Sequence, residues 1–266
     1  MKILRATVST AAITVCLISA AFARKAETGF LDRTMSVSGE SYRYQVFVPA
    51  NWDAHRKWPV ILFLHGAGER GDDGLLQTDV GLGHAIRKNA ANFPFVVVMP
   101  QCRKEKIWSD PAMEAQALAV LDRTTKEFHG DPSRTYLTGL SLGGYGIWDL
   151  AAKYPGRFAA YVPICGGIHG PQRSPQVSVS LANDPKVADP YAETARRIGK
   201  TPVWIFHGDT DPSVPVEESR KMYAALQAAN ANVKYTEYPG VGHESWNNAY
   251  AEPGLVPWLL EQHLQH

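Results

Sequence analysis

A serine between two glycines stands where a strand-like stretch of the sequence meets a helix-like one. Residues 135–138 (TYLT) lead into residues 139–144 (GLSLGG), which fit the G-x-S-x-G pattern of a nucleophile elbow. In such a turn, side chains at the glycine positions would collide with the backbone, and the serine hydroxyl is pushed above the sheet. A glycine-rich turn with a capping serine is the alternative, but the strand–turn–helix context favours Ser141 as a nucleophile at a helix N-terminus, where N–H groups stabilise negative charge.

A serine hydroxyl needs a base to accept its proton, and histidine is the side chain best suited to this near neutral pH. The sequence has nine histidines, and a site at the end of a sheet favours those that follow a strand. His243 follows the strand-like residues 233–238 through a Pro-Gly-Val-Gly loop. His65 and His207 also end strands, but each is followed directly by glycine, which favours a structural role. We therefore predict His243 as the base.

A third group must hold the histidine in the correct tautomer and stabilise its positive charge. Residues 207–216 (HGDTDPSVPV) follow the strand-like residues 203–206 and offer two acids, Asp209 and Asp211. Aspartate in a turn commonly accepts backbone hydrogen bonds, which suits Asp209. We favour Asp211 as the acid of the site and keep Asp209 as the alternative.

Acyl transfer at a serine creates an oxyanion, which needs two preformed hydrogen-bond donors. The N–H of Leu142, directly after the nucleophile, is one candidate. The second is expected in residues 64–71 (LHGAGERG), after the first buried strand, since small residues let a backbone approach a ligand closely. We predict the N–H of Ala67, with Gly68 as the alternative; a simple strand-to-helix turn would explain the same letters.

Alternating strand-like and helix-like stretches predict an α/β fold with a mostly parallel sheet. An alternating run at 42–48 predicts a half-exposed strand, and continuous apolar runs predict buried ones; these lie at residues 59–64, 95–99, 135–138, 158–164 and 203–206, with a last strand at 233–238. Helical periodicity predicts helices at residues 111–128, 216–229 and 255–263. Residues 168–190 are rich in Pro, Ser, Gly and Asp, and either a lid over the site or a surface excursion fits them.

Composition excludes several classes of protein. Hydrophobic residues make up 45% and charged residues 20% of the 266 residues, and the net charge is +1, so neither disorder nor a nucleic-acid partner is expected. The sequence has no run of eighteen consecutive apolar residues, so we expect no stable membrane insertion. We find no metal-binding or dinucleotide-binding motif, and we expect no metal and no cofactor.

The N-terminus has the pattern of a secretory signal peptide. Lys2 and Arg5 precede an apolar stretch, residues 11–23, that ends in Ala-Phe-Ala, which is a cleavage pattern. We predict a signal peptide at residues 1–23, a single catalytic domain at residues 24–266, and a secreted or periplasmic location; an N-terminal membrane anchor is the alternative. Cys102 and Cys165 would remain after cleavage, and export permits a disulfide between them.

Four blocks, each after a strand-like run, together resemble the α/β-hydrolase superfamily: residues 65–71 (HGAGERG), 139–144 (GLSLGG), 207–216 (HGDTDPSVPV) and 242–246 (GHESW). The chain order serine, acid, histidine is that of this superfamily. The closest branch resembles the secreted phospholipase/carboxylesterase-like group, which shades into polyhydroxybutyrate-depolymerase-like and feruloyl-esterase-like proteins, many of them labelled predicted peptidases. The similarity covers nearly all of residues 40–262.

This resemblance implies an eight-stranded, mostly parallel sheet with helices on both faces, and a triad of Ser141, Asp211 and His243. It would also place two strands between Cys102 and Cys165, about 14 Å at ~4.8 Å per strand, whereas a disulfide needs Cα atoms within about 7 Å. Only bent loops would then let the two cysteines pair, and the question stays open.

Aromatic side chains after strand ends are candidates for the substrate pocket. Trp108 and Trp246 are the predicted walls, although ordinary packing would explain either. The sequence thus predicts an exported serine esterase that acts on a small-molecule or polymer-linked ester. A serine peptidase of prolyl-oligopeptidase type and a non-catalytic binding protein on a hydrolase fold are the alternatives. The acyl group, the alcohol and the oligomeric state are not predicted.

Overall fold

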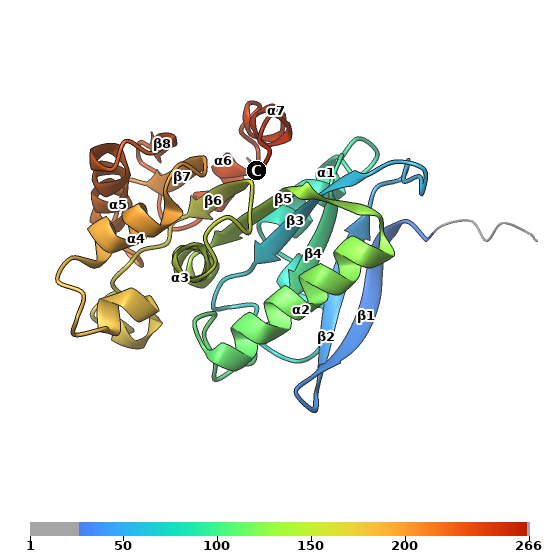
Figure 1. Cartoon of the computed structure of the whole chain (residues 1–266), viewed down its shortest axis with the longest axis horizontal. Helices are drawn as coiled ribbons and strands as arrows, with labels where there is room; N and C mark the ends of the chain where they lie inside the picture. The colour runs from blue at the N-terminus through green and yellow to red at the C-terminus, as the bar shows by residue number, and fades with distance from the viewer. Residues whose placement is uncertain (1–26, 265–266) are drawn as a thin grey trace, which may run out of the picture.

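A single mixed sheet organises the computed structural model, which describes residues 27–264. Its eight strands lie in the order β1-β2-β4-β3-β5-β6-β7-β8 (Figure 1). In chain order, the strands are β1 (Gly29–Val37), β2 (Glu40–Val48), β3 (Trp58–Leu64), β4 (Val96–Pro100), β5 (Gly130–Leu140), β6 (Ala160–Ile164), β7 (Val203–Gly208) and β8 (Val233–Tyr238). The predicted fold class, an eight-stranded and mostly parallel sheet, is confirmed.

The direction of the strands decides where a site can form. β1 and β2 pair antiparallel, as do β2 and β4, while all the pairs from β4 to β8 are parallel. Parallel strands buried on both faces read as continuous apolar runs, as β3 and β4 do. The carboxyl ends of β3, β5, β7 and β8 therefore lie along one edge of the sheet, where ligands bind in open α/β folds.

Helices cover both faces of the sheet (Figure 1). Alternate residues of β3 point to opposite sides: Val60, Leu62 and Leu64 join one core, and Ile61 and Phe63 join the other. The first core is covered by α2 (Pro111–Glu127), α3 (Leu142–Lys153), α4 (Pro190–Ile198) and α5 (Glu217–Ala228), and the second by α1 (Leu82–Lys88), α6 (Trp246–Ala249) and α7 (Leu255–Leu260).

Elements with weak sequence patterns are where the structure differs from expectation. The sequence predicts no strand at the residues of β1, because an edge strand without a fully buried residue shows no apolar run. The short helices α1, α4 and α6 are not predicted either. The C-terminal helix ends at Leu260 rather than at residue 263. Within residues 168–190 there are two single-turn 3-10 helices, η2 (Pro175–Val177) and η3 (Ser180–Asn183); a third, η1 (Leu76–Thr78), precedes α1.

The predicted signal peptide, residues 1–23, lies outside the described residues. Cys102 and Cys165 are both buried free thiols, so the structure does not pair them; Cys102 follows β4 and Cys165 follows β6, with β3 and β5 between those strands. Among the helices of residues 27–264, none has both the length and the apolar character to cross a membrane.

Candidate active site

Ser141 occupies a strained turn between β5 and α3. Its backbone angles are φ 52° and ψ −117°, a conformation that side chains other than glycine rarely adopt. The glycines of the motif are required by space. A Cβ on Gly143 would lie 1.9 Å from the Leu64 carbonyl oxygen, and one on Gly139 would lie 2.5 Å from the same atom. β3 therefore packs directly against the turn, which presents the Ser141 hydroxyl at the edge of the sheet.

The structure joins the three predicted triad side chains in one hydrogen-bonded chain. His243 Nε2 lies 2.9 Å from Ser141 Oγ, and His243 Nδ1 lies 2.7 Å from Asp211 Oδ2. The three residues follow β5, β7 and β8, so the parallel register of these strands brings them together. The His243 side chain is 22% exposed, while the side chain of Asp211 is inaccessible. This is the order of nucleophile, base and orienting acid that activates a serine.

Asp211 is held as a carboxylate by several donors. Its Oδ1 accepts hydrogen bonds from the N–H groups of Ser213 and Val214, at 2.7 and 3.0 Å. Burial by itself would raise the pKa of Asp211, but the hydrogen bonds from His207, His243 and the Val214 N–H outweigh it and hold that pKa well below its ordinary value. The acid therefore stays ionised throughout the physiological range and can stabilise a positive charge on His243.

His207 supports this acid, a contact that the sequence did not suggest. Its ring is buried, with Nε2 3.2 Å from Asp211 Oδ2 and 3.1 Å from the Val214 carbonyl oxygen. Nδ1 lies 2.7 Å from Ser219 Oγ, so we assign the ring proton to Nε2, with Nδ1 accepting from the hydroxyl. The only sequence signal for this residue was its place at the end of β7.

The alternative acid, Asp209, lies outside the chain of hydrogen bonds that reaches Ser141. Its Oδ1 accepts a hydrogen bond from the Gly240 N–H at 2.7 Å, in an exposed position. That bond ties the loop after β7 to the loop after β8. Asp209 thus has the turn-capping role that favoured Asp211 for the site.

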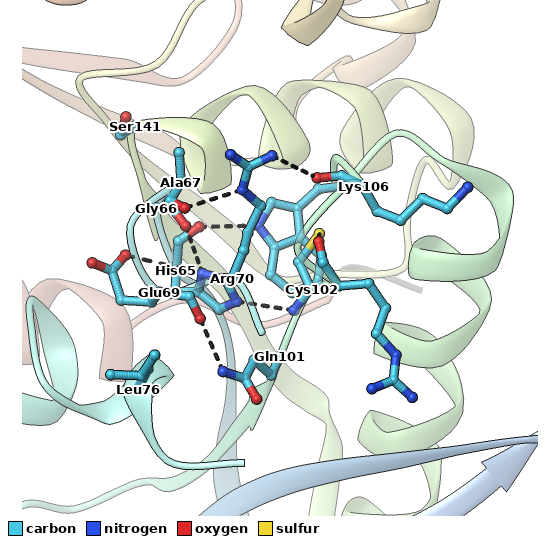
Figure 2. A network of polar contacts seen from close by, with 12 residues as sticks. His65, Gly66, Ala67, Glu69, Arg70, Leu76, Gln101, Cys102, Lys106 and Ser141 are labelled. Carbon is cyan, nitrogen blue, oxygen red and sulfur yellow. Dashed lines mark hydrogen bonds and ion pairs between the residues drawn. The ribbon is translucent and has the colours of Figure 1, made fainter. Parts of the chain in front are cut away.

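The 65–71 loop, which follows β3, lies against Ser141 (Figure 2). Ala67 lines the same pocket as Ser141, Leu142 and His243. Leu142 is the first residue of α3, so its N–H has no acceptor within the helix. Among residues 27–264, no hydrogen bond uses the N–H of Ala67. The two predicted donors are thus placed beside the nucleophile and available to an incoming oxygen.

Buried polar groups fix the backbone of the 65–71 loop. His65 Nε2 accepts a hydrogen bond from the Cys102 N–H at 2.9 Å, and His65 Nδ1 lies 2.6 Å from the Gly66 carbonyl oxygen (Figure 2). Burial lowers the pKa of His65 to about 4, so the ring is neutral at pH 7. The Gln101 amide donates to the Glu69 carbonyl at 3.0 Å, and Arg70 Nε donates to the Ala67 carbonyl at 3.0 Å.

Neither predicted pocket tryptophan lines the pocket, which corrects both assignments. Trp108 is only 1% exposed, and its Nε1 donates to the His65 carbonyl at 3.0 Å, so it supports the 65–71 loop from within the core. Trp246 packs edge-on against the His243 ring, with centroids 5.3 Å apart. Both tryptophans follow strand ends near the site, as expected, but both point at the machinery rather than into the cavity.

The pocket at Ser141 has a volume of about 190 Å³. One wall is the 168–183 segment, which contributes Pro171, Arg173, Ser174 and Val177. The remaining lining residues come from the turn after β5, from α3 and from the loops after β3, β7 and β8: Ala67, Ser141, Leu142, Tyr145, Ser213, Val214 and His243. The sequence could not predict which of residues 168–190 line the pocket, because this segment has no strong periodicity.

Two carboxylates hold the 168–183 segment in place. Glu218 of α5 accepts hydrogen bonds from the N–H groups of Ile168 and His169, at 2.8 and 2.9 Å, and from the Tyr191 hydroxyl at 2.7 Å. Asp149 of α3 accepts one from the Ser180 N–H at 2.6 Å. The segment is therefore an ordered wall of the pocket and not a free surface excursion.

Among the described residues, Cys165, Asp211 and His243 bring three metal-ligating atoms within 4.8 Å of one another. His243 Nδ1 and Asp211 Oδ2 are already hydrogen-bonded to each other, and burial raises the pKa of the Cys165 thiol, which disfavours the thiolate that a metal needs. We assign Asp211 and His243 to the proton-transfer chain rather than to a metal site.

Known proteins share both the fold and the sequence pattern. Residues 36–251 match the Esterase family, described as “Putative esterase”. The crystal structure of a thermostable esterase superposes with a TM-score of 0.71 at 33% identity, over 88% of this chain and 63% of that chain.

Two curated relatives extend the comparison. Isoprenylcysteine alpha-carbonyl methylesterase of Arabidopsis thaliana is 29% identical over 240 residues, covering 76% of this chain and 53% of that protein. A secreted protein of Arthroderma benhamiae is 25% identical over 229 residues, covering 78% of this chain and 23% of that protein. The chain thus spans between about a quarter and about half of the length of these two relatives.

The α/β-hydrolase resemblance is thereby confirmed, and the matched family is one of esterases, in agreement with the predicted carboxylic-ester hydrolase. Since the family match extends over most of the sequence, the chain belongs to the Esterase family and has the α/β-hydrolase fold.

Proposed function

We propose that the protein hydrolyses carboxylic esters through an acyl-enzyme on Ser141. The observation that carries this proposal is the continuous hydrogen-bonded chain from Ser141 Oγ through His243 to Asp211, at 2.9 and 2.7 Å. Such a chain can deprotonate the hydroxyl while it attacks, since the base lies within hydrogen-bonding distance of the proton that it must accept.

The reaction would proceed in two halves. His243 Nε2 takes the proton of Ser141 as Oγ attacks the ester carbonyl, and the N–H groups of Ala67 and Leu142 bind the oxyanion. The ester C–O bond then breaks, and the alcohol leaves with the proton from His243. Water, deprotonated by the same ring, attacks the acyl-enzyme and releases the acid.

We also propose that the protein is exported, to the periplasm or the medium. The pattern of a charged start, an apolar run and Ala-Phe-Ala at residues 21–23 supports this, as does the secreted relative. Expression of the full chain in a bacterial host, followed by the mass of the protein in the periplasm and the medium, tests it. A mature N-terminus at Arg24 is expected, and full-length protein that stays inside the cell would contradict export.

The activity is tested with p-nitrophenyl esters from acetate to palmitate, with methyl ferulate and with a peptide anilide, using wild type and Ser141→Ala. Ester turnover is expected, with a loss on the order of 10⁴–10⁶ in the variant. A fluorophosphonate should label wild type and not Ser141→Ala. Turnover of the anilide alone would favour a peptidase, and lack of both turnover and labelling would favour a non-catalytic protein.

A further inference from the structure

Arg173 is a cation in the pocket wall that has no partner among the described residues. It lies in the exposed part of the 168–183 segment and lines the pocket together with Ser141 and His243. The neighbouring arginines along the chain, at positions 157, 196 and 197, all pair with carboxylates. Within residues 27–264, by contrast, neither an ion pair nor a hydrogen bond of the side chain includes Arg173.

The other charges around the pocket do not neutralise Arg173. In the part of the chain that the structure describes, no carboxylate belongs to the lining. Asp211, behind His243, is engaged by two histidines and two backbone N–H groups. Glu69 is not a lining residue of this pocket, and its Oε2 lies 4.0 Å from His65 Nδ1. Arg70 adds a second positive charge behind Ala67, with its guanidinium bound to the carbonyls of Ala67 and Lys106 (Figure 2).

We propose that Arg173 makes this pocket select esters that carry a carboxylate a few bonds away from the scissile carbonyl. This inference rests on the proposed function. A guanidinium presents paired N–H donors that match a carboxylate, and such charge-assisted hydrogen bonds are about twice as strong as neutral ones. The lining also includes the apolar side chains of Pro171, Val177 and Val214, which would pack against the short chain that joins the carboxylate to the ester.

The size of the pocket limits the substrate further. Its volume of about 190 Å³ lies below the range of about 300–1,000 Å³ of pockets that enclose drug-sized ligands. A short carboxylate-bearing chain fits this space, whereas a long acyl chain would extend beyond these lining residues. The substrate class is thus a short half-ester of a dicarboxylic acid, or an acyl ester of a short hydroxy acid.

The experiment compares esters that differ in charge and hardly in shape. Monomethyl glutarate is measured against methyl 5-oxohexanoate, in which a methyl group replaces the charged oxygen, and against the cationic methyl 5-aminopentanoate. Sodium 4-acetoxybutyrate places the carboxylate on the alcohol side and so distinguishes the two orientations. The readout is the ratio of kcat/KM for the anionic ester to that for its neutral partner.

Wild type is expected to prefer the anionic ester about five- to tenfold, in line with a partly exposed charge-assisted contact. Arg173→Gln should bring the ratio close to one, and Arg173→Lys should keep part of it. Lys186→Gln is the matched control, since it removes one exposed positive charge shortly after the 168–183 segment and away from the pocket lining. Raising the salt from about 0.01 M to about 1 M, where the Debye length falls from about 30 to about 3 Å, should shrink the wild-type ratio.

The outcomes separate this inference from the function on which it rests. Ser141-dependent turnover of neutral esters with no anionic preference would overturn the role of Arg173 and leave the esterase intact. A preference that persists in Arg173→Gln, or that disappears equally in Lys186→Gln, would also overturn it. Failure to cleave any ester would overturn the proposed function itself.

Discussion

Two regions enclose the pocket, and the protein holds them in place by different means. Three neutral groups of the core hold the 65–71 loop: the ring of His65, the indole of Trp108 and the amide of Gln101. The guanidinium of Arg70 adds one bond at the surface, to the Ala67 carbonyl. The 168–183 segment is held by hydrogen bonds from its backbone N–H groups to two carboxylates, Glu218 of α5 and Asp149 of α3.

This difference follows from the position of each region. The 65–71 loop leaves the centre of the sheet, so core side chains surround it and supply its partners. The 168–183 segment lies outside the sheet, where its backbone N–H groups need other acceptors, and charged carboxylates are strong ones. The side of the pocket assigned to the oxyanion is therefore built into the core, and the side assigned to specificity can vary without disturbing it.

The largest effect is expected when the orienting acid is removed, and this loss of kcat is the reference for the variants of the 65–71 loop and the 168–183 segment. Asp211→Asn should lower kcat about 10⁴-fold, or about 5.5 kcal/mol in the barrier, because an amide stabilises the wrong tautomer of the histidine. Asp209→Asn is the control: its oxygen can still accept from Gly240, and kcat should change less than about threefold. Similar losses in both variants would contradict the assignment of Asp211.

The second effect concerns the 65–71 loop and is measured as the pH dependence of the free energy of unfolding. The folded pKa of His65 is about 4 against about 6.5 in an unfolded chain, so between these values the unfolded state binds the extra proton and stability falls with acidification. From pH 7 to 4, wild type should lose about 3 kcal/mol more free energy of unfolding than His65→Gln does, as measured by denaturant titration. His55→Gln, at an exposed position, should follow the wild-type curve. Parallel curves for wild type and His65→Gln would refute the prediction.

The third effect separates support of the 65–71 loop from general stability. Trp108→Phe removes the hydrogen bond to the His65 carbonyl and should lower kcat about tenfold, about 1.4 kcal/mol, because the donor at Ala67 shifts. Trp52→Phe removes an equivalent bond, to the Phe128 carbonyl at 3.0 Å, far from the site. Both variants should lose about 1 kcal/mol of stability, and only Trp108→Phe should lose turnover. Equal kcat values in the two would show that Trp108 is mere packing.

The smallest effect concerns the 168–183 segment. Glu218→Gln replaces charged acceptors by a neutral amide, which costs about 1 kcal/mol, and KM should rise about fivefold while kcat changes little. Glu217→Gln is the matched control, since Glu217 is a surface residue paired with Arg220 and such pairs contribute about 0–1 kcal/mol. A large fall in kcat with an unchanged KM would show that the 168–183 segment acts in the chemical step and not in substrate binding.

The sequence by itself predicted the elements with strong local patterns. The central strands are continuous apolar runs, since parallel strands are buried on both faces, and β8 begins and ends at the predicted residues. The glycines on either side of Ser141 predict a tight turn. A larger residue at either position would clash with the Leu64 carbonyl, which lies against the turn. The G-x-S-x-G motif predicts the nucleophile, and position after a strand predicts the acid and the base; the structure brings these three side chains together.

Only the tertiary structure decided what surrounds that site. His207 and Asp211 are only four residues apart, but the turn after β7 decides that their side chains meet. The inward direction of Trp108 and the two carboxylates on the 168–183 segment depend on contacts between residues distant in sequence. Residue type and periodicity describe which face of an element is apolar, but they do not say which of several neighbours a buried polar group will contact. The local sequence thus determined the turn and the strands, whereas the pocket walls and their charges arose from how those strands and helices pack.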